Sequence, residues 1–486
     1  MNAIDYGNLF SITLPETILE VVSLLVLIVD LAWMRKSARA TRMSVSCALG
    51  FLGSVSAIAW IAANSQTSAA LGNALVATPL VAATQIGILA LTALVLLLSI
   101  RVEFSRNPGE FVAIVLLGTT GMMLVTAARD LLIVFVALEL LSLSLYVLAA
   151  FAKSSALSAD AALKYYLFGG MSAALMLFGF SYLYGLTGTT NLAGIAASLA
   201  AQPTSPLLIV AFVLVAAGLG FKVAVAPFHL WAPDTYQGAP TPVAALIASG
   251  SKVASFALLI AVTEAVIPAS APLQGASWIV LLVWMAAGSI VLGNLAALVQ
   301  TSVRRLLAYS AIAHAGYMLL GIAANTQQSN AAVLYYALTY ALTTVGAFGV
   351  IAIVERGAGS DRLDAFSGMS RRNPLLAAAM LLFLLSLAGI PPLVGFWAKF
   401  NLFAAVLRSP STGHWGLALI ALALGASSVS LYYYLQVLKR IYVLKPVQPE
   451  PLPISTLEIV TLVLIALAVA ALGILPAALS AWIPLG

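Results

Sequence analysis

Long runs of apolar residues alternate with short polar connections along the whole chain. Each run is long enough for a helix to cross the hydrocarbon core of a bilayer, which takes about 20 apolar residues. The pattern predicts an all-α polytopic membrane protein with about fourteen transmembrane helices. The predicted spans cover residues 9–33, 43–63, 78–100, 110–128, 130–151, 158–186, 206–229, 242–267, 278–300, 303–323, 331–354, 374–407, 414–438 and 456–482.

Composition narrows the class of protein further. Of the 486 residues, 62% are hydrophobic and 8% are charged, so little chain remains for an extramembrane domain. A hydrophilic catalytic domain and a nucleic-acid-binding module are therefore excluded, and the GxxxxGK[ST] motif of a phosphate-binding loop is missing. Cys47 is the only cysteine, which excludes an internal disulfide and a cysteine-ligated iron–sulfur cluster. Any redox chemistry belongs to another chain.

The basic residues are concentrated in every second connection. This alternation is the one that the positive-inside rule requires of a correctly counted set of spans. The inside connections hold Arg35, Lys36, Arg39, Arg42, Arg101, Arg106, Lys153, Arg304, Arg305, Arg356, Arg362, Arg371, Arg372, Lys439, Arg440 and Lys445. The outside connections hold only Arg129 and Arg408. We therefore expect both termini on the outer side, and the net charge of +6 reflects topology more than acidic partners.

Two segments of the chain resemble each other. AALKYYLFGGMSAALMLFG (161–179) and AAVLYYALTYALTTVGAFG (331–349) share Ala-Ala, Tyr-Tyr and Phe-Gly at one offset. They fall in the sixth and eleventh spans, which cross the membrane in opposite directions. AGLGFK (217–222) and GIPPLVGFWAK (389–399) form a second pair in the seventh and twelfth spans. This arrangement predicts two inverted five-helix repeats, spans 4–8 and 9–13, as in many transporters.

The repeats predict a division of one integral membrane domain into four parts. These are a three-helix addition at residues 1–105, a first repeat at 106–270, a second repeat at 271–445 and a C-terminal helix at 446–486.

Four lysines fall within apolar runs: Lys164, Lys222, Lys252 and Lys399. A charged side chain at the centre of a bilayer costs about 2.5–3.5 kcal/mol on insertion scales, so each needs a reason to be there. One reason is snorkelling, in which the long aliphatic stem carries the ammonium to the interface. Snorkelling suits Lys164 best, because it lies near the start of its helix. It suits Lys399 least, because a predicted helix break precedes it.

Glu139 lies near the middle of the fifth span, with no internal cation on the same helix. Counted from a turn near Lys153, Glu139 is about 21 Å deep and Lys164 about 17 Å up the next helix. The two side chains are thus expected to meet. Unit charges about 4 Å apart interact by roughly 4 kcal/mol at an effective dielectric near 20. A movable Glu139 would switch Lys164 between its charged and neutral forms, whereas a rigid pair would be structural.

Two spans contain signals for a broken helix. In the twelfth span, the consecutive prolines of GIPPLVGFWAKF cannot continue an α-helix, and Lys399 follows them. In the seventh span, Gly218 and Gly220 precede Lys222, and Pro227 follows it. Irregular backbone at membrane depth is tolerated only inside protein or beside a water-filled cavity. Breaks at corresponding places in two repeats therefore indicate an ion pathway.

Two histidines are further candidates for that pathway. His229 suits either a relay or an interfacial anchor, and His314 suits either a water-lined relay or a hydrogen-bonded core histidine. A metal site is not expected, because the three histidines lie on different predicted elements. Glu139 is the only carboxylate that lies plainly in the middle of a predicted span. A sodium site needs several oxygen ligands together, so the sequence favours protons as the transported ion. Asp30 is expected to be a surface partner of the inside arginines.

Several segments resemble a known family. They are LPETILEVVSLLVLIVDL near the start, VALELLSLSLYVLAAF around Glu139, ADAALKYYLFGGMSAALMLFGFSYLYGLTG around Lys164, GFKVAVAPFHLWAPDTYQGAPTPVAALIASGSKVA and LAGIPPLVGFWAKF. Together they resemble the antiporter-like membrane subunits of the NADH-quinone oxidoreductase, respiratory complex I, and chain N above the others. Chain N is favoured over chain L because no long extension follows the last span. It is favoured over chain M because Lys399 stands where chain M has a glutamate.

The resemblance implies a proton-translocating subunit of that complex. Glu139 and Lys164 would form a modulating pair, Lys222 would be the central carrier, Lys252 the connector and Lys399 the residue that releases the proton outside. His229 and His314 remain possible members of the relay. Flavin, iron–sulfur clusters and quinone would belong to other subunits, and no cofactor to this chain. The implied partners are chain M and small helical subunits in a bacterial inner membrane. A multisubunit cation/proton antiporter is the alternative.

Overall fold

The computed structural model describes residues 5–64, 67–102, 107–201, 205–267, 276–410, 415–446 and 450–480. Within this part of the chain, the only strands are β1 (Ser68–Ala70) and β2 (Leu75–Ala77), which form an antiparallel hairpin. Arg106, the predicted boundaries at 105/106 and 270/271, residue 414 and residues 481–482 lie outside the described residues.

Helices make up almost all the rest. In chain order they are α1 (Tyr6–Ile28), η1 (Val29–Trp33), α2 (Arg39–Ala63), α3 (Pro79–Ser99), α4 (Pro108–Ala127), α5 (Leu131–Ala149), α6 (Ala156–Thr187), α7 (Leu192–Ala200), α8 (Pro206–Val223), α9 (Trp231–Gly238), α10 (Thr241–Ala248), α11 (Gly250–Val266), α12 (Ala276–Leu298), α13 (Val303–Ala324), α14 (Gln327–Ala358), η3 (Leu363–Phe366), α15 (Met369–Arg372), α16 (Pro374–Ala388), α17 (Val394–Arg408), α18 (Trp415–Tyr442), α19 (Thr456–Ile474) and α20 (Ala477–Ser480).

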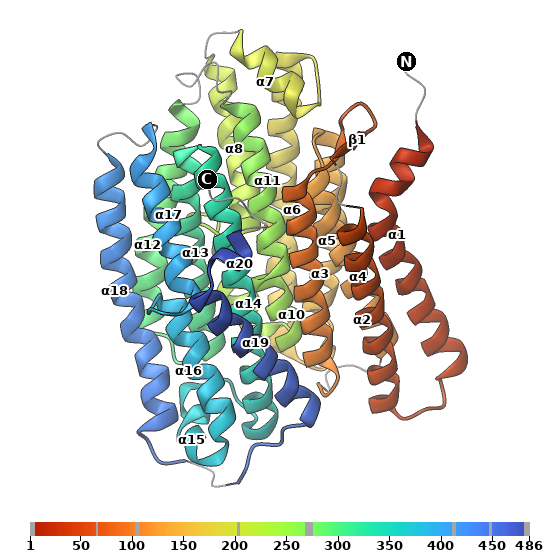
Figure 1. Cartoon of the computed structure of the whole chain (residues 1–486), viewed down its shortest axis with the longest axis vertical. Helices are drawn as coiled ribbons and strands as arrows, with labels where there is room; N and C mark the ends of the chain where they lie inside the picture. The colour runs from red at the N-terminus through yellow and green to blue at the C-terminus, as the bar shows by residue number, and fades with distance from the viewer. Residues whose placement is uncertain are drawn as a thin grey trace.

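The helices form one bundle whose members run roughly along its long axis (Figure 1). In the described residues, thirteen helical segments are long and apolar enough to cross a membrane. The predicted twelfth span corresponds to two shorter helices, the apolar α16 and the following α17. The chain is therefore a multi-pass membrane protein, and the predicted all-α fold is confirmed. The agreement follows from the apolar runs, since most of the long helices end close to polar residues, glycine or proline that interrupt the run.

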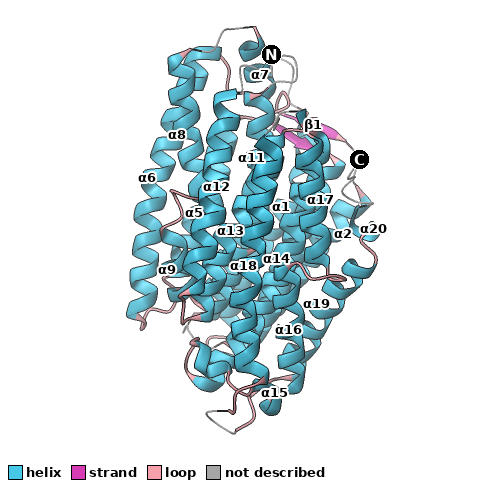
Figure 2. Ribbon diagram, turned by 90° about the vertical axis from the view of Figure 1, so that its left-hand side faces the viewer, coloured by secondary structure: helices cyan, strands magenta, loops and turns pink. Residues whose placement is uncertain are grey.

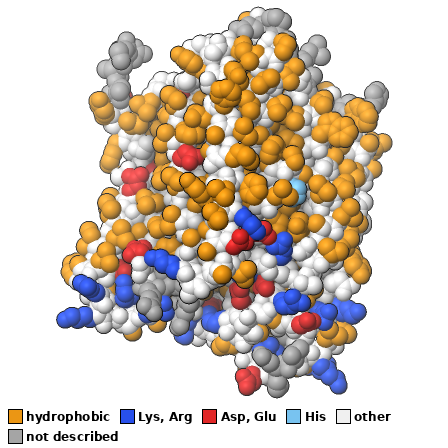
Figure 3. All heavy atoms as spheres, turned by 180° about the vertical axis from the view of Figure 1, so that it is seen from behind, with side chains coloured by type: hydrophobic (Ala, Val, Ile, Leu, Met, Phe, Trp, Pro, Cys, Tyr) orange, Lys and Arg blue, Asp and Glu red, His pale blue; other side chains and the backbone are white. Residues whose placement is uncertain are grey.

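The two ends of the bundle differ in charge. The connections with Arg35, Lys153, Arg304, Arg371 and Lys439 lie at one end, which we call the basic end. It carries α15, and the charged side chains visible in Figure 3 collect toward it. The opposite end, which we call the N-terminal end, carries α7, the β1–β2 hairpin and the start of α1 (Figure 2). Hydrophobic side chains cover most of the surface between the two ends, as expected for a protein in lipid.

Two spans are broken near their middle. The α8 helix ends at Val223, Ala224 adopts a left-handed conformation with φ of 58°, and α9 begins at Trp231. The α16 helix ends at Ala388, and α17 begins at Val394. The second break is the one predicted from the consecutive prolines. The first begins between Lys222 and Pro227, within the stretch predicted from the glycines and the proline, while Gly218 and Gly220 themselves are helical.

Several features recur in the two predicted repeats. Both α6 and α14 have 32 residues and end at a glycine in the left-handed conformation, Gly188 and Gly359. An isolated antiparallel bridge joins Asp130 to Asn191, and another joins Ser302 to Arg362. Each bridge therefore ties the start of one span to the end of the next. These correspondences support the predicted division into repeats, which stays a prediction.

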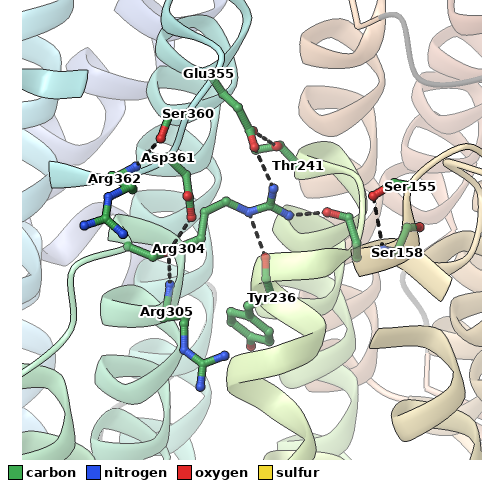
Figure 4. A network of polar contacts seen from close by, with 12 residues as sticks. Ser155, Ser158, Tyr236, Thr241, Arg304, Arg305, Glu355, Ser360, Asp361 and Arg362 are labelled. Atoms are coloured by element: carbon green, nitrogen blue, oxygen red, sulfur yellow. Dashed lines mark hydrogen bonds and ion pairs between the residues drawn. The ribbon is translucent and has the colours of Figure 1, made fainter. Parts of the chain in front are cut away.

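A buried arginine joins the broken seventh span to the second half of the chain (Figure 4). Arg304 at the start of α13 is 4% exposed, and its Nε donates to the Tyr236 carbonyl at 2.8 Å. Its other nitrogens contact the Ala239 carbonyl and Glu355 of α14, and Glu355 also accepts from Thr241. The guanidinium fork satisfies main-chain carbonyls that α9 leaves free where it ends.

Substitution of Arg304 by leucine is expected to destabilise the protein. Removing the arginine leaves two main-chain carbonyls without a donor and takes the cation from Glu355, which keeps Thr241 as a donor. A buried acceptor that loses its donor costs about 1–3 kcal/mol. Arg440→Leu is the control, because Arg440 pairs with Asp364 at the surface, where such pairs are worth about 1 kcal/mol or less. Thermal unfolding of the detergent-solubilised variants measures the difference. Equal midpoints for the two variants would contradict the clamping role of Arg304.

Candidate functional site

Three buried lysines lie beside interruptions in helices. Lys222 is in the last turn of α8, Lys252 follows the interruption at Ser249 between α10 and α11, and Lys399 is in the first turns of α17. Their exposed fractions are 8%, 2% and 7%. In the described part of the chain, none of the three has a carboxylate oxygen within 4.0 Å of its ammonium. Neutral oxygens take the place of counter-ions.

Lys222 is a buried lysine within electrostatic range of Glu139. Its Nζ contacts the Ser142 hydroxyl, and Ser142 lies one turn beyond Glu139 on α5. The charge of Glu139 also acts on Lys222. One Glu139 oxygen, Oε1, is buried with no hydrogen-bond partner in the described residues. Glu139 and Lys222 therefore interact at a distance, without an ion pair within 4.0 Å, and Ser142 of the Glu139 helix contacts the lysine.

The predicted pair of Glu139 with Lys164 is wrong. Lys164 Nζ lies 2.8 Å from Asp234 Oδ2 and 3.0 Å from Asp160 Oδ2. The reason lies in side-chain direction, because Cβ atoms tilt toward the N-terminus of their own helix. The α5 and α6 helices run in opposite directions, so Glu139 tilts toward the N-terminal end and Lys164 toward the basic end. Similar depth in the membrane does not bring them together.

Lys164 belongs instead to an ionic cluster at the edge of the bundle. Asp234 of α9 accepts from Lys164 and, at 2.5 Å, from Arg305 of α13. The Lys164 side chain is 41% exposed, so it is not a member of the buried set. The sequence carried one signal for this arrangement, since Asp160 precedes Lys164 by one helical turn. The contact with Asp234 is a tertiary one that spacing along the chain does not indicate.

Lys252 is the most deeply buried of the three lysines. Its Nζ donates to the main-chain carbonyl of Ala311 on α13 at 2.6 Å. The ammonium also lies 5.7 Å from the ring centre of Tyr340, within the range of a cation–π interaction. Lys252 therefore spans from α11 to α13 and α14, which places it beside the next polar group.

His314 lies between Lys252 and Lys399. The charges of both lysines act on it, and its ring is 4.9 Å from that of Tyr340. Its Nδ1 is 2.7 Å from the Tyr336 hydroxyl, and its Nε2 is 3.3 Å from the Tyr434 hydroxyl. Both ring nitrogens thus have a hydroxyl group as hydrogen-bond partner. The two tyrosines were not identified from the sequence, because tyrosines within apolar runs are most often core residues.

A small cavity adjoins the histidine. Its volume is about 10 Å³, and its lining includes His314, Tyr336, Tyr340, Ser386 and Gly395. That volume accommodates about one water molecule. The polar lining provides the hydrogen-bond partners that a buried water needs.

Lys399 is held by the end of the broken helix. Its Nζ donates to the Ala388 carbonyl at 2.8 Å and to the Ser427 hydroxyl at 2.7 Å. The Ala388 carbonyl is free because α16 ends there, and a cation at a helix C-terminus is favourable. Gly389 has φ of 87°, and a Cβ on it would lie 2.9 Å from Lys399 Cδ. The break thus provides both the acceptor and the space for the lysine.

Two other candidates do not join this row of groups. His229 lies in the break between α8 and α9, is half-buried, and has an Nδ1 without a hydrogen-bond partner in the described residues. Asp30, expected at the surface, is 1% exposed and pairs with Arg42 at 2.6 Å. The predicted partnership with a basic residue is correct, but the predicted exposure is wrong, because Gly109 lets α4 approach the carboxylate.

We use the name row for the buried residues Lys222, Lys252, His314 and Lys399 together with Glu139, which is only partly buried. An ammonium donates three hydrogen bonds, whereas a neutral amine donates two and accepts one. Neutral oxygens tolerate either form, so each lysine of the row can hold or release a proton. In the described residues, no group of three or more His, Cys, Asp or Glu side chains lies close enough to hold a metal ion. The row is suited to protons.

Replacement of Lys252 by methionine is expected to leave thermal stability unchanged or to raise it. Lys252 has no counter-ion among the described residues, so methionine of similar length removes the desolvation cost of an unpaired buried charge. Thermal unfolding of the solubilised protein is the measurement, with Lys439→Met as the exposed control. A large fall in the midpoint for Lys252→Met alone would mean that the lysine is a structural element.

Comparison with known proteins gives concordant matches. The family described as NADH:quinone oxidoreductase/Mrp antiporter, TM matches residues 128–427. NADH-quinone oxidoreductase subunit N 2 of Acidobacterium capsulatum is 48% identical over 500 residues, covering 99% of this chain and all of that protein. A chain of respiratory complex I from Thermus thermophilus with bound aureothin has a TM-score of 0.80 and 36% identity, covering 95% of this chain and 97% of that one. A chain of the Mrp complex from Dietzia sp. has a TM-score of 0.82 but 21% identity, with 97% of both chains covered, which is a likeness of fold alone.

Proposed function

The chain belongs to the NADH:quinone oxidoreductase/Mrp antiporter membrane family, and on this premise we propose that it is the antiporter-like subunit N of an NADH-quinone oxidoreductase, in which it translocates protons. The observation that carries the mechanism is the row of buried lysines held by neutral oxygens. Full-length similarity to a subunit N supports the assignment to that complex. A cation/proton antiporter subunit is the second candidate, but its support is a likeness of fold at 21% identity.

In the proposed complex, the redox groups are held by other subunits. Flavin, iron–sulfur clusters and quinone belong to other subunits, and Cys47 is buried and alone. The proposed neighbours are the antiporter-like chain M and small helical subunits. We place the protein in a bacterial inner membrane with both termini on the periplasmic side, because the basic end then faces the cytoplasm.

Proton movement is proposed to begin at Lys222. Glu139 favours the charged form of Lys222 when it is near, and Ser142 links the two helices that carry them. Displacement of Glu139 weakens that attraction and releases a proton toward Lys252. One charge crossing 100 mV requires about 2.3 kcal/mol, which is the size of a change in one such pair.

The second half of the path leads through His314 to Lys399. The histidine accepts and donates through its two ring nitrogens, whose partners are Tyr336 and Tyr434. Lys399 then holds the proton at the end of α16, and α17 leads from there to the N-terminal end of the bundle. Lys164 acts outside this row, through Asp234, and holds α6 against the broken seventh span.

Substitution of Lys399 by methionine tests the relay. NADH-driven proton uptake into vesicles by the assembled complex is expected to fall at least about tenfold, because positioned proton-transfer groups typically contribute about 100-fold or more. Lys439→Met is the matched control, since it removes an exposed lysine at the basic end. Undiminished uptake in an assembled Lys399→Met complex would remove this residue from the path.

A double-mutant cycle tests which lysine responds to Glu139. Effects of Glu139→Gln and Lys222→Met on turnover are expected to be non-additive, because the two residues form one electrostatic unit. Effects of Glu139→Gln and Lys164→Met are expected to add, since Lys164 is paired with Asp234. Turnover of NADH by the three single and the two double variants decides between them. Coupling in the Lys164 cycle but not in the Lys222 cycle would overturn the assignment.

A further inference from the structure

A buried carboxyl group lies outside the row, in the N-terminal helix. Glu16 of α1 is 4% exposed. Its Oε1 accepts a hydrogen bond from Gln85 Nε2 of α3 at 3.0 Å. Its Oε2 has no hydrogen-bond partner in the described residues, and Glu16 takes part in none of the ion pairs found there. The proposed relay does not use this group.

The other buried carboxyl group of the same helical segment is held differently. Asp30 is 1% exposed, and both of its oxygens accept from the Arg42 guanidinium, at 2.7 and 2.6 Å. The Gly109 amide adds a third donor at 3.2 Å. These contacts suit a carboxylate. Besides its own main-chain amide, Glu16 has one donor from another residue, where Asp30 has three, although the two are buried to a similar degree.

The neighbouring helices offer Glu16 no positive charge. The titratable residues of α2 are Arg39, Arg42 and Cys47, all in its half nearest the basic end, and α4 has only Glu110, at that same end. The α3 helix and the β1–β2 hairpin have none.

On α1 itself, Glu20 follows one turn later, and its negative charge acts on Glu16. A buried carboxylate with one donor from another residue and no cation is strongly disfavoured, and a like charge nearby adds to the penalty. The neutral acid fits the site better than the anion.

A polar cavity connects the site to the N-terminal end of the bundle. It has a volume of about 50 Å³ and lies between α1, α2, α3 and the hairpin. Its polar lining residues are Ser11, Trp60, Asn64, Ser68, Thr78 and Gln85. Such a volume accommodates a few water molecules. Gln85 therefore touches the cavity on one side and the Glu16 carboxyl on the other.

We propose that Glu16 is a proton-binding site, separate from the central row, that exchanges its proton with the aqueous phase at the N-terminal end through this cavity. The Gln85 amide nitrogen also donates to the Met123 carbonyl of α4 at 3.2 Å. Protonation of Glu16 therefore changes the hydrogen bonds of Gln85, the residue that links α1, α3 and α4. The site is independent of the proposed relay.

Carboxyl-selective labelling tests the protonation state. Dicyclohexylcarbodiimide reacts with protonated carboxyl groups in apolar surroundings, and peptide mass spectrometry locates the label. In the intact complex in its native membrane, Glu16 is expected to be labelled and Asp30 to remain unlabelled, although both are buried. Labelling of both residues would attribute the reaction to burial alone and would overturn the proposal.

If the carbodiimide does not reach Glu16, infrared difference spectra determine the protonation state of its carboxyl group. The spectrum of the wild type minus that of Glu16→Gln is expected to contain the carbonyl band of a protonated carboxyl group near neutral pH, and that band should shift in heavy water. A carboxylate band in its place would overturn the proposal. Because the readout is spectroscopic, it is distinguishable from a failure of the relay.

A separate variant tests whether the proton of Glu16 exchanges through the cavity. Ala82 lines the cavity, so Ala82→Leu is expected to fill part of it. The carboxyl band should remain, while its shift after transfer into heavy water becomes slower than in the wild type. An unchanged rate of shift in a variant that keeps the band would show that the proton reaches Glu16 by another route.

Discussion

An ammonium group inside an apolar bundle must find its hydrogen-bond acceptors within the protein, because lipid offers none. Much of the architecture satisfies this requirement. Lys222, Lys252 and Lys399 all lie next to places where a helix is interrupted, and an interrupted helix has carbonyl groups without amide partners. At Lys399 the relation is direct, because the Ala388 carbonyl that accepts from it is free only where α16 ends. At Lys399 the break thus supplies the acceptor that the lysine needs, whereas Lys222 and Lys252 bond to groups on the unbroken helices α5 and α13. The apolar helices around all three lysines separate them from the lipid.

The same requirement explains how the two halves of the chain meet. The broken seventh span would expose free carbonyls at the end of α9, and Arg304 from the second half covers them. Arg305, its neighbour, shares Asp234 with Lys164 from the first half. Adjacent arginines at the start of α13 thus hold the same short helix from two sides. The polar row crosses from one half to the other close to this clamp, where Lys252 contacts α13.

Most of the fold was predictable from the sequence, whereas the partners within the site were not. Apolar runs and the alternation of basic connections determine the number and order of spans, since both depend only on position along the chain. The lysines and the glutamate within those runs could be identified as candidates in the same way, because a charged residue in an apolar run is recognised from its position alone. Partner choice depends on the rotation and direction of each helix. Depth alone paired Glu139 with Lys164, but antiparallel α5 and α6 point these side chains apart. The tyrosine partners of His314 come from α14 and α18, and no local pattern distinguishes them from core residues.

The acceptors of Lys252 and Lys399 have a consequence for genetics. The Ala311 and Ala388 carbonyls belong to the main chain, so no point mutation deletes them. A screen for suppressors or loss-of-function alleles would recover the lysines but would score both alanines as tolerant wherever a replacement side chain fits. Lineages that diverge can likewise exchange these side chains while the acceptor stays in place. Mutagenesis therefore cannot test these two main-chain acceptors. Chemical replacement of a backbone amide by an ester is the perturbation that weakens them.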